Sequence, residues 1–199
     1  MSDMLYDASI EYEKLKDTIY KIVVGRKGKA YILILHFPPE SFFHLAGLQH
    51  LTDITFPSTN KERIYKEIKS GNLTMKDIRK SVFFDKWFIE ERLQNFQFLD
   101  EMIDSNSITY LINAKRYITY TDIKADYLCE HFLDNEVLYL FLVKERCPKF
   151  ENECKGCSFF RKHGYDYTIG TAKTSTLLIE KIKDGKTLTV FRNPVYVEL

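Results

Sequence analysis

Long apolar runs are scarce in this chain of 199 residues. The longest one, from Val137 to Val143, is far shorter than the roughly 20 residues of a membrane-spanning helix. The first residues, Met1 to Asp7, hold two acids and lack the apolar segment of a secretory signal. We therefore expect a cytoplasmic protein without a membrane span.

A strong charge of one sign is also missing. The formal net charge is only +1, which excludes the strongly basic composition of many nucleic-acid-binding proteins. The charge is nevertheless uneven, because residues 144–199 hold 11 Lys or Arg against 7 Asp or Glu. The carboxyl-terminal quarter is therefore the better candidate for binding phosphate.

Cysteine is infrequent, with four residues in the chain. In a cytoplasmic protein these are reduced thiols or metal ligands rather than disulfides. Cys147, Cys154, Cys157 and His163 lie close together in the sequence and offer the four ligands of one tetrahedral, structural zinc. Only one Cys-x2-Cys pair is present, so free thiols are the alternative interpretation.

Aromatic residues are abundant, with 13 Tyr and 15 Phe. This number exceeds the needs of one core, so we expect some rings in grooves, where they can stack. The apolar share of 45% and the charged share of 29% are those of an ordinary globular protein. The length fits a single domain spanning residues 1–199, with residues 55–104 as a helical insertion.

The spacing of apolar residues predicts helices first and strands later. Helical periodicity is found over residues 5–19, 40–53, 60–80 (two helices broken at Gly71-Asn72) and 84–104. Strand-like segments are residues 20–24, 30–35, 108–112, 127–132, 137–144, 176–183 and 186–192, the last two joined by Asp184-Gly185. The predicted class is α+β: an amino-terminal helix and hairpin, a helical middle and a carboxyl-terminal antiparallel sheet.

One candidate for chemistry is the segment from Phe43 to Asp53. Its His44 carries an imidazole, which titrates near neutrality and can exchange a proton with a ribose hydroxyl or a leaving oxygen. On a continuous helix His50 would point well away from His44, which favours a single catalytic histidine. A purely structural role for His44 is the alternative.

A second candidate is the polar segment from Ser158 to Thr176. It holds the basic residues Arg161, Lys162, His163 and Lys173 and the hydroxyls of Tyr165, Tyr167, Thr168, Thr171 and Thr174. Fixed cations and hydroxyl donors can bind a phosphate and stabilise the charge of a pentavalent transition state. The alternative is an ordinary polar loop between strands.

The two segments together resemble a known family. The pattern Phe-His-Leu-x-Gly-Leu-x-x-Leu-x-Asp at residues 43–53, followed by Asp-Tyr-Thr-Ile-Gly at 166–170 and Lys173, resembles the fourth phage-associated subgroup of the barnase, EndoU, colicin and RelE-like nucleases. His50 stands where that pattern leads us to expect lysine. The resemblance implies amino-terminal helices, then an antiparallel sheet whose face carries His, Lys or Arg, and Ser or Thr for RNase chemistry.

The resemblance also implies roles for residues. The implied catalytic residues are His44, Lys173, Thr168 and Thr174, and the implied substrate-binding residues are Arg161, Tyr165, Tyr167, Thr171 and His50. It implies an endoribonuclease that needs no catalytic cofactor and cleaves RNA through 2′-hydroxyl attack, as a toxin or mobile-element effector with a cognate antitoxin or inhibitor protein. The alternative is a non-catalytic module that binds nucleic acid or protein, in one version stabilised by zinc.

Overall fold

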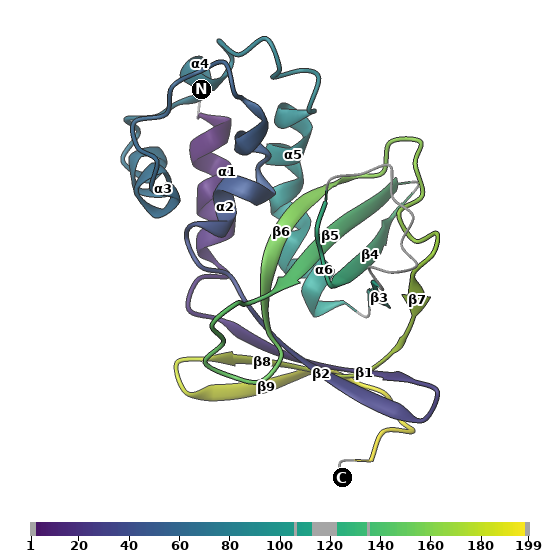
Figure 1. Cartoon of the computed structure of the whole chain (residues 1–199). Helices are drawn as coiled ribbons and strands as arrows, with labels where there is room; N and C mark the ends of the chain where they lie inside the picture. Colours follow the sequence, from purple (N-terminus) through teal and green to yellow (C-terminus); the bar gives the residue numbers. More distant parts are fainter. Residues whose placement is uncertain (1–2, 106, 113–122, 135, 198–199) are drawn as a thin grey trace.

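A computed structural model of the chain describes residues 3–105, 107–112, 123–134 and 136–197. The helices gather on one side of a strongly curled sheet, and the strands β1, β2, β8 and β9 cross its lower end (Figure 1). The predicted α+β class is confirmed. No helix within these residues is long and apolar enough to cross a membrane.

The helices of the described residues are short. They are α1 (Met4–Glu13), α2 (Ser41–Leu45), the 3-10 turn η1 (Leu48–His50), α3 (Lys61–Lys69), α4 (Met75–Ile78), α5 (Ile89–Asn95), the 3-10 turn η2 (Phe96–Phe98) and α6 (Leu99–Asp104). The predicted break at Gly71 is confirmed. The other predicted helices are shorter than expected. Positive φ is found near their boundaries, at Asp17 after α1, Gly47 after α2 and Phe88 before α5.

The strands form one sheet. They are β1 (Ile19–Arg26), β2 (Lys29–His36), β3 (Ile108–Leu111), β4 (Tyr127–Leu133), β5 (Glu136–Lys144), β6 (Glu153–Arg161), β7 (Ala172–Lys173), β8 (Ser175–Lys183) and β9 (Lys186–Arg192). Their order is β7-β3-β4-β5-β6-β2-β1-β8-β9. The predicted amino-terminal hairpin is confirmed, but it lies inside the sheet, and because β2 pairs with β6 in parallel the sheet is mixed and not purely antiparallel as predicted.

Strand β6 was missed by the sequence reading. It pairs with β5 and β2 and supports α2, yet its centre holds Lys155, Gly156 and Cys157, which interrupt an apolar pattern. Gly156 has a structural reason, since a Cβ there would lie 2.9 Å from a methyl carbon of Leu45. The absence of a side chain at this position lets α2 approach the sheet closely.

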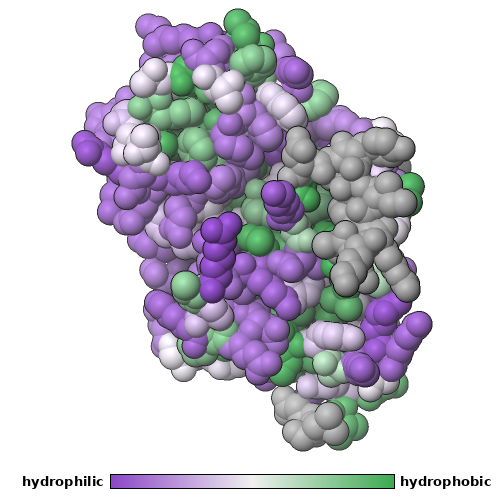
Figure 2. All heavy atoms as spheres, in the orientation of Figure 1, coloured by the Kyte–Doolittle hydropathy of each residue, from purple (hydrophilic) through white to green (hydrophobic). Residues whose placement is uncertain are grey.

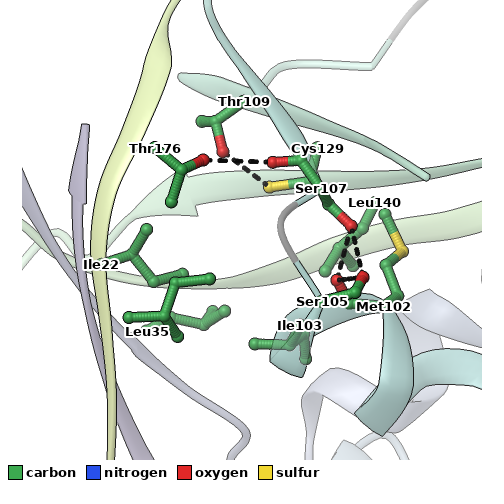
Figure 3. A pocket seen from close by; sticks show the side chains of 11 residues that line it. Ile22, Leu35, Met102, Ile103, Ser105, Ser107, Thr109, Cys129, Leu140 and Thr176 are labelled. Atoms are coloured by element: carbon green, nitrogen blue, oxygen red, sulfur yellow. Dashed lines mark hydrogen bonds between the residues drawn. The ribbon is translucent and has the colours of Figure 1, made fainter. Parts of the chain in front are cut away.

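The sheet curls until β3 reaches the chain that leads into β8. The backbone N–H and the hydroxyl of Thr174 both donate to the carbonyl of Thr109, at 2.9 and 2.6 Å. The interior between these strands is filled by side chains such as Ile22, Leu35 and Leu140 (Figure 3). It leaves a cavity of about 20 Å³, which has room for little more than one water molecule. A substrate must therefore bind elsewhere.

Two apolar clusters cover the two faces of the sheet. The main cluster joins α1 and the other helices to the inner face, and a smaller one on the opposite face contains Tyr139, Phe141 and Phe160. At the centre of the main cluster, Tyr12 is fully buried, and its ring makes edge contacts with Phe37 and Phe42 among others. Its hydroxyl donates to the carbonyl of Pro38, 2.8 Å away. Tyr12 thereby ties α1 to the segment that enters α2.

Replacing Tyr12 by Ala should lower the free energy of unfolding by about 3–5 kcal/mol, because it leaves a large cavity and an unpaired carbonyl. Tyr6→Ala is the matched control, since this ring lies on the same helix but is 38% exposed. The control should change stability by less than about 1 kcal/mol. Urea unfolding measures both, and equal losses in the two variants would refute the central position of Tyr12.

Candidate functional site

A cleft of about 620 Å³ opens between the helical side and the face of the sheet that carries the smaller apolar cluster. Its volume lies in the range of ligand-binding sites. The residues that line it are Gln49, His50, Lys86, Trp87, Phe88, Arg92, Ile123, Lys124, Cys157, Ser158, Phe160, His163 and Tyr167. They come from η1, the start of α5, strand β6, the loop after β6 and the segment before β4.

The charge of this lining is positive. Lys86, Arg92 and Lys124 contribute cations, and no Asp or Glu belongs to the lining in the described part of the chain. None of the three cations forms an ion pair there, whereas Lys155, Lys162 and Lys181 elsewhere do. Much of the surface seen in Figure 2 is hydrophilic, so polarity alone does not distinguish the cleft. Its distinguishing feature is that three cations line one concave space whose described lining holds no carboxylate.

Arg92 is the most constrained of these cations, with only 6% of its surface exposed. Its Nε donates to the carbonyl of Trp87 at 3.0 Å, and its Nη1 donates to the carbonyl of Phe159 at 3.2 Å. Its guanidinium lies 4.7 Å from the centre of the Phe160 ring. Burial lowers the pKa of Arg92 to about 10, so the group stays charged at neutral pH.

Buried charges in proteins are normally paired with an opposite charge. The described residues give Arg92 neutral acceptors only, and its Nη2 donates to none of them. A planar guanidinium held in this way is suited to a phosphate or carboxylate of a ligand. Arg92 is therefore the strongest anion-binding candidate in the cleft.

The approach of Arg92 depends on Gly47. This glycine has φ of +75°, in the left-handed region that L side chains rarely adopt. A Cβ at this position would also lie 2.9 Å from Cδ of Arg92 and 3.1 Å from its Nε. The glycine therefore ends α2, turns the chain into η1 and leaves room for the arginine.

His50 follows this turn and lies on the wall of the cleft. Its ring stacks on the indole of Trp87, with centroids 3.9 Å apart and planes 11° from parallel. The side-chain amide of Gln49 lies 3.2 Å from its Nε2, and the tautomer of the ring sets the direction of this hydrogen bond. Burial, and then the Arg92 cation, lower the pKa of His50 to about 4, so the ring is neutral at pH 7.

A second imidazole belongs to His163. Its ring stacks on Phe88 at 4.0 Å and 12°, and its Nε2 lies 2.9 Å from a carboxylate oxygen of Glu91. Phe88 directly follows Trp87, so two consecutive aromatic residues each support one histidine of the cleft. This arrangement holds two proton-transfer groups and one buried cation around a single space.

The two sequence motifs contribute His50 and Tyr167, both implied by the resemblance to bind substrate, to the lining of the cleft. In the first motif, Asp53 accepts a hydrogen bond from the Ser81 hydroxyl and another, at 2.8 Å, from the Val82 backbone. This contact anchors the segment that leads to Trp87 and Phe88.

In the second motif, Asp166 accepts bonds from the backbone N–H and hydroxyl of Thr168 at 2.9 and 2.6 Å. The Thr168 hydroxyl bond is the main cause that lowers the pKa of Asp166 to about 2. The turn places Tyr167 in the cleft, against Phe160 and Phe141. Both motifs therefore meet at the cleft.

The predicted pair of His44 and Lys173 is not brought together by any contact of the described residues. His44 is half-buried on α2, and burial, then Lys61 and Lys155, lower its pKa to about 4. It lies near enough to His50 to affect that ring electrostatically but does not line the cleft. Lys173 is exposed on β7, four strands away from the β6 strand that supports α2.

The other predicted substrate groups make internal contacts. The hydroxyls of Thr171 and Thr174 donate to the carbonyls of Thr168 and Thr109, at 2.5 and 2.6 Å. Arg161 bonds Glu136 at 2.5 Å and Asn95 at 3.2 Å. The Tyr165 ring packs edge-on against Tyr167, with centroids 4.8 Å apart. These hydrogen bonds and ring contacts stabilise the fold around the cleft.

The four predicted zinc ligands are not gathered by the structure. Cys154 is fully buried in the main core, whereas Cys157 packs with the apolar cluster on the opposite face and lines the cleft. Cys147 is exposed in the segment before β6, and His163 contacts Glu91. Over the described ranges, no three His, Cys, Asp or Glu residues are placed to hold a metal ion.

Sequence reasoning missed Arg92, Trp87, Phe88, Lys86 and Lys124. The first three were assigned only to a helix or its start, and their apolar neighbours gave no sign of a site. A usable signal was the chain's one Trp beside Lys86 and Phe88, since a basic and aromatic cluster at a helix start is unusual for a core-facing segment. Their convergence with His50 depends on tertiary structure.

One comparison with known families gives a match over nearly the whole chain. The model of a family described as phage-Barnase-EndoU-ColicinE5/D-RelE like nuclease4 matches residues 4–193. No curated protein and no solved structure matches the chain significantly. The family match includes both motifs and every residue that lines the cleft. As the resemblance predicted, the chain belongs to this phage-associated nuclease family.

Proposed function

We propose that the chain is an endoribonuclease that cleaves RNA in the cleft by attack of a ribose 2′-hydroxyl on the adjacent phosphate. The observation that carries the proposal is the buried Arg92 cation, which has neutral acceptors only among the described residues and opens on a space flanked by two imidazoles. Membership of a nuclease family supports a phosphodiester as the anion.

The residues suit each step of such a reaction. Neutral His50 accepts the proton of the 2′-hydroxyl as that oxygen forms a bond to phosphorus. The bond from phosphorus to the 5′-oxygen breaks, and His163 donates a proton to the leaving oxygen. Arg92 neutralises the charge that develops on the phosphoryl oxygens. The products are a 2′,3′-cyclic phosphate and a 5′-hydroxyl.

The composition of the cleft supports a reaction without a catalytic metal. Nuclease metals such as Mg²⁺ are bound mainly through carboxylates, which the described lining lacks. Two imidazoles and three cations offer proton transfer and charge neutralisation from side chains alone.

Aromatic residues favour single-stranded RNA as the substrate. Trp87, Phe88, Phe160 and Tyr167 all line the cleft, and unpaired bases stack on such rings. A 2′-hydroxyl nucleophile is present in RNA and missing from DNA.

We place this activity in the cytoplasm, as an RNA-cleaving effector of a mobile element or phage that a cognate protein restrains.

His50→Ala should reduce cleavage of a single-stranded RNA in EDTA by about 10²–10⁴-fold, because the proton acceptor is removed. The folded fraction, measured by circular dichroism, should not change. Lys173→Ala is the control and should cleave at the wild-type rate. Loss of activity in Lys173→Ala with full activity in His50→Ala would instead support the His44 and Lys173 assignment. Binding without cleavage in the wild type would identify the non-catalytic alternative.

Gly47→Ala should reduce kcat/KM roughly 10–100-fold, since the added Cβ displaces Arg92 by a fraction of an ångström or more. Gly71→Ala is a matched control, because this glycine has the same φ of +75° but no atom within 4 Å of an added Cβ. Both variants should lose about 1–2 kcal/mol of stability. Equal activity in the two variants would show that the position of Arg92 is unimportant.

The acid limb of the pH profile of kcat/KM should lie near pH 4. Because the folded pKa of His50 is lowered to about 4, the ring stays neutral and competent until the pH approaches that value, and protonation below it stops base catalysis. An unperturbed imidazole would give a limb near pH 6.5. Initial rates from pH 4 to 7.5, with the fold checked at each pH, test this, and a limb near 6.5 would exclude His50 as the base.

A further inference from the structure

We infer that Phe88 is the platform on which an unpaired base of the substrate stacks next to the scissile phosphate. This inference rests on the proposed ribonuclease function and assigns a specificity-determining role to a residue that neither sequence motif contains. Phe88 lines the cleft and is 48% exposed, so part of its surface is accessible to a ligand.

The backbone of Phe88 supports a functional role. Its φ and ψ are 52° and 40°, which is the left-handed conformation. A bulky residue is disfavoured there, and residues in such conformations cluster at functional sites. Asn or Gly would fit the turn before α5 with less strain. The presence of phenylalanine therefore indicates a use for its ring.

The ring has one covered face. His163 stacks on it at 4.0 Å, and Glu91 in turn bonds His163 at 2.9 Å, so the platform is held from behind. Because one face lies against His163, a ligand can stack only on the other face of Phe88. A flat, uncharged aromatic group fits this surface.

The surrounding charges indicate which aromatic ligand fits. Lys86 is two residues before Phe88, and Arg92 is one helical turn after it, and both line the same cleft. A base on Phe88 would thus have cations nearby for its phosphates. Because a paired base is stacked within a helix, the platform selects single-stranded RNA.

The test is the affinity of a fluorescent single-stranded oligonucleotide with 2′-O-methyl groups, which cannot be cleaved because its 2′ oxygen cannot attack. Phe88→Asn should weaken binding at least about fivefold, while Phe88→Trp should retain it. The melting temperature of Phe88→Asn should equal or exceed that of the wild type, since Asn tolerates the left-handed conformation. Phe132→Asn is the matched control, because Phe132 is 59% exposed on β4 outside the cleft.

Equal binding by the wild type and Phe88→Asn would overturn the inference, as would equal losses in Phe88→Asn and Phe88→Trp. A duplex of the same sequence should bind less tightly, with no difference between the wild type and Phe88→Asn. Failure of the ribonuclease proposal gives a different result: the wild type would bind the oligonucleotide but would not cleave unmodified RNA. In that case the comparison of variants still decides the role of Phe88.

Discussion

A buried arginine that has no carboxylate partner among the described residues is the constraint around which the site is built. Arg92 is held by the carbonyls of Trp87 and Phe159 and by the face of Phe160. Neutral acceptors fix the direction of the guanidinium without neutralising it. Its charge remains available to a ligand and, in the proposed reaction, to the transition state.

The same cation influences the chemistry of its neighbour. Burial and the nearby positive charge keep His50 neutral, which is the form that accepts a proton. The stacking of His50 on Trp87 and of His163 on Phe88 restricts both rings before a substrate binds. Preorganised groups of this kind lower the cost of ordering the site during the reaction. In the proposed reaction, the electrostatics and the packing of the cleft thus both prepare the two imidazoles for proton transfer.

The sequence predicted the class of fold, most strands and the family, because these depend on local patterns. The Asp184-Gly185 hairpin and the two helices around Gly71 are examples in which turn chemistry alone determines the structure. Strand β6 and its parallel pairing with β2 were not predictable in this way. Its polar centre disrupts the local pattern, and its partner is more than a hundred residues away.

Two of the residues expected to bind substrate, His50 and Tyr167, line the candidate cleft. The two motifs do converge on one cleft, but Gly47 interrupts the expected helix and redirects His50, which a continuous helix would have pointed elsewhere. The hydroxyls of Thr168 and Thr174 looked suited to phosphate, yet each is used by a turn or a strand connection. Arg92 gave no local signal, because its importance depends on its burial and on the neutral acceptors that the described residues place around it.

The chemical identity of the ends produced from RNA tests the central claim most directly. Attack by the 2′-hydroxyl, assisted by imidazoles and a fixed cation, leaves a 2′,3′-cyclic phosphate on one fragment and a 5′-hydroxyl on the other. Mass spectrometry of a short RNA cut by the purified chain in EDTA should find these two ends. Fragments that carry 3′-hydroxyl and 5′-phosphate ends would contradict the account, because they require attack by water in place of the ribose oxygen.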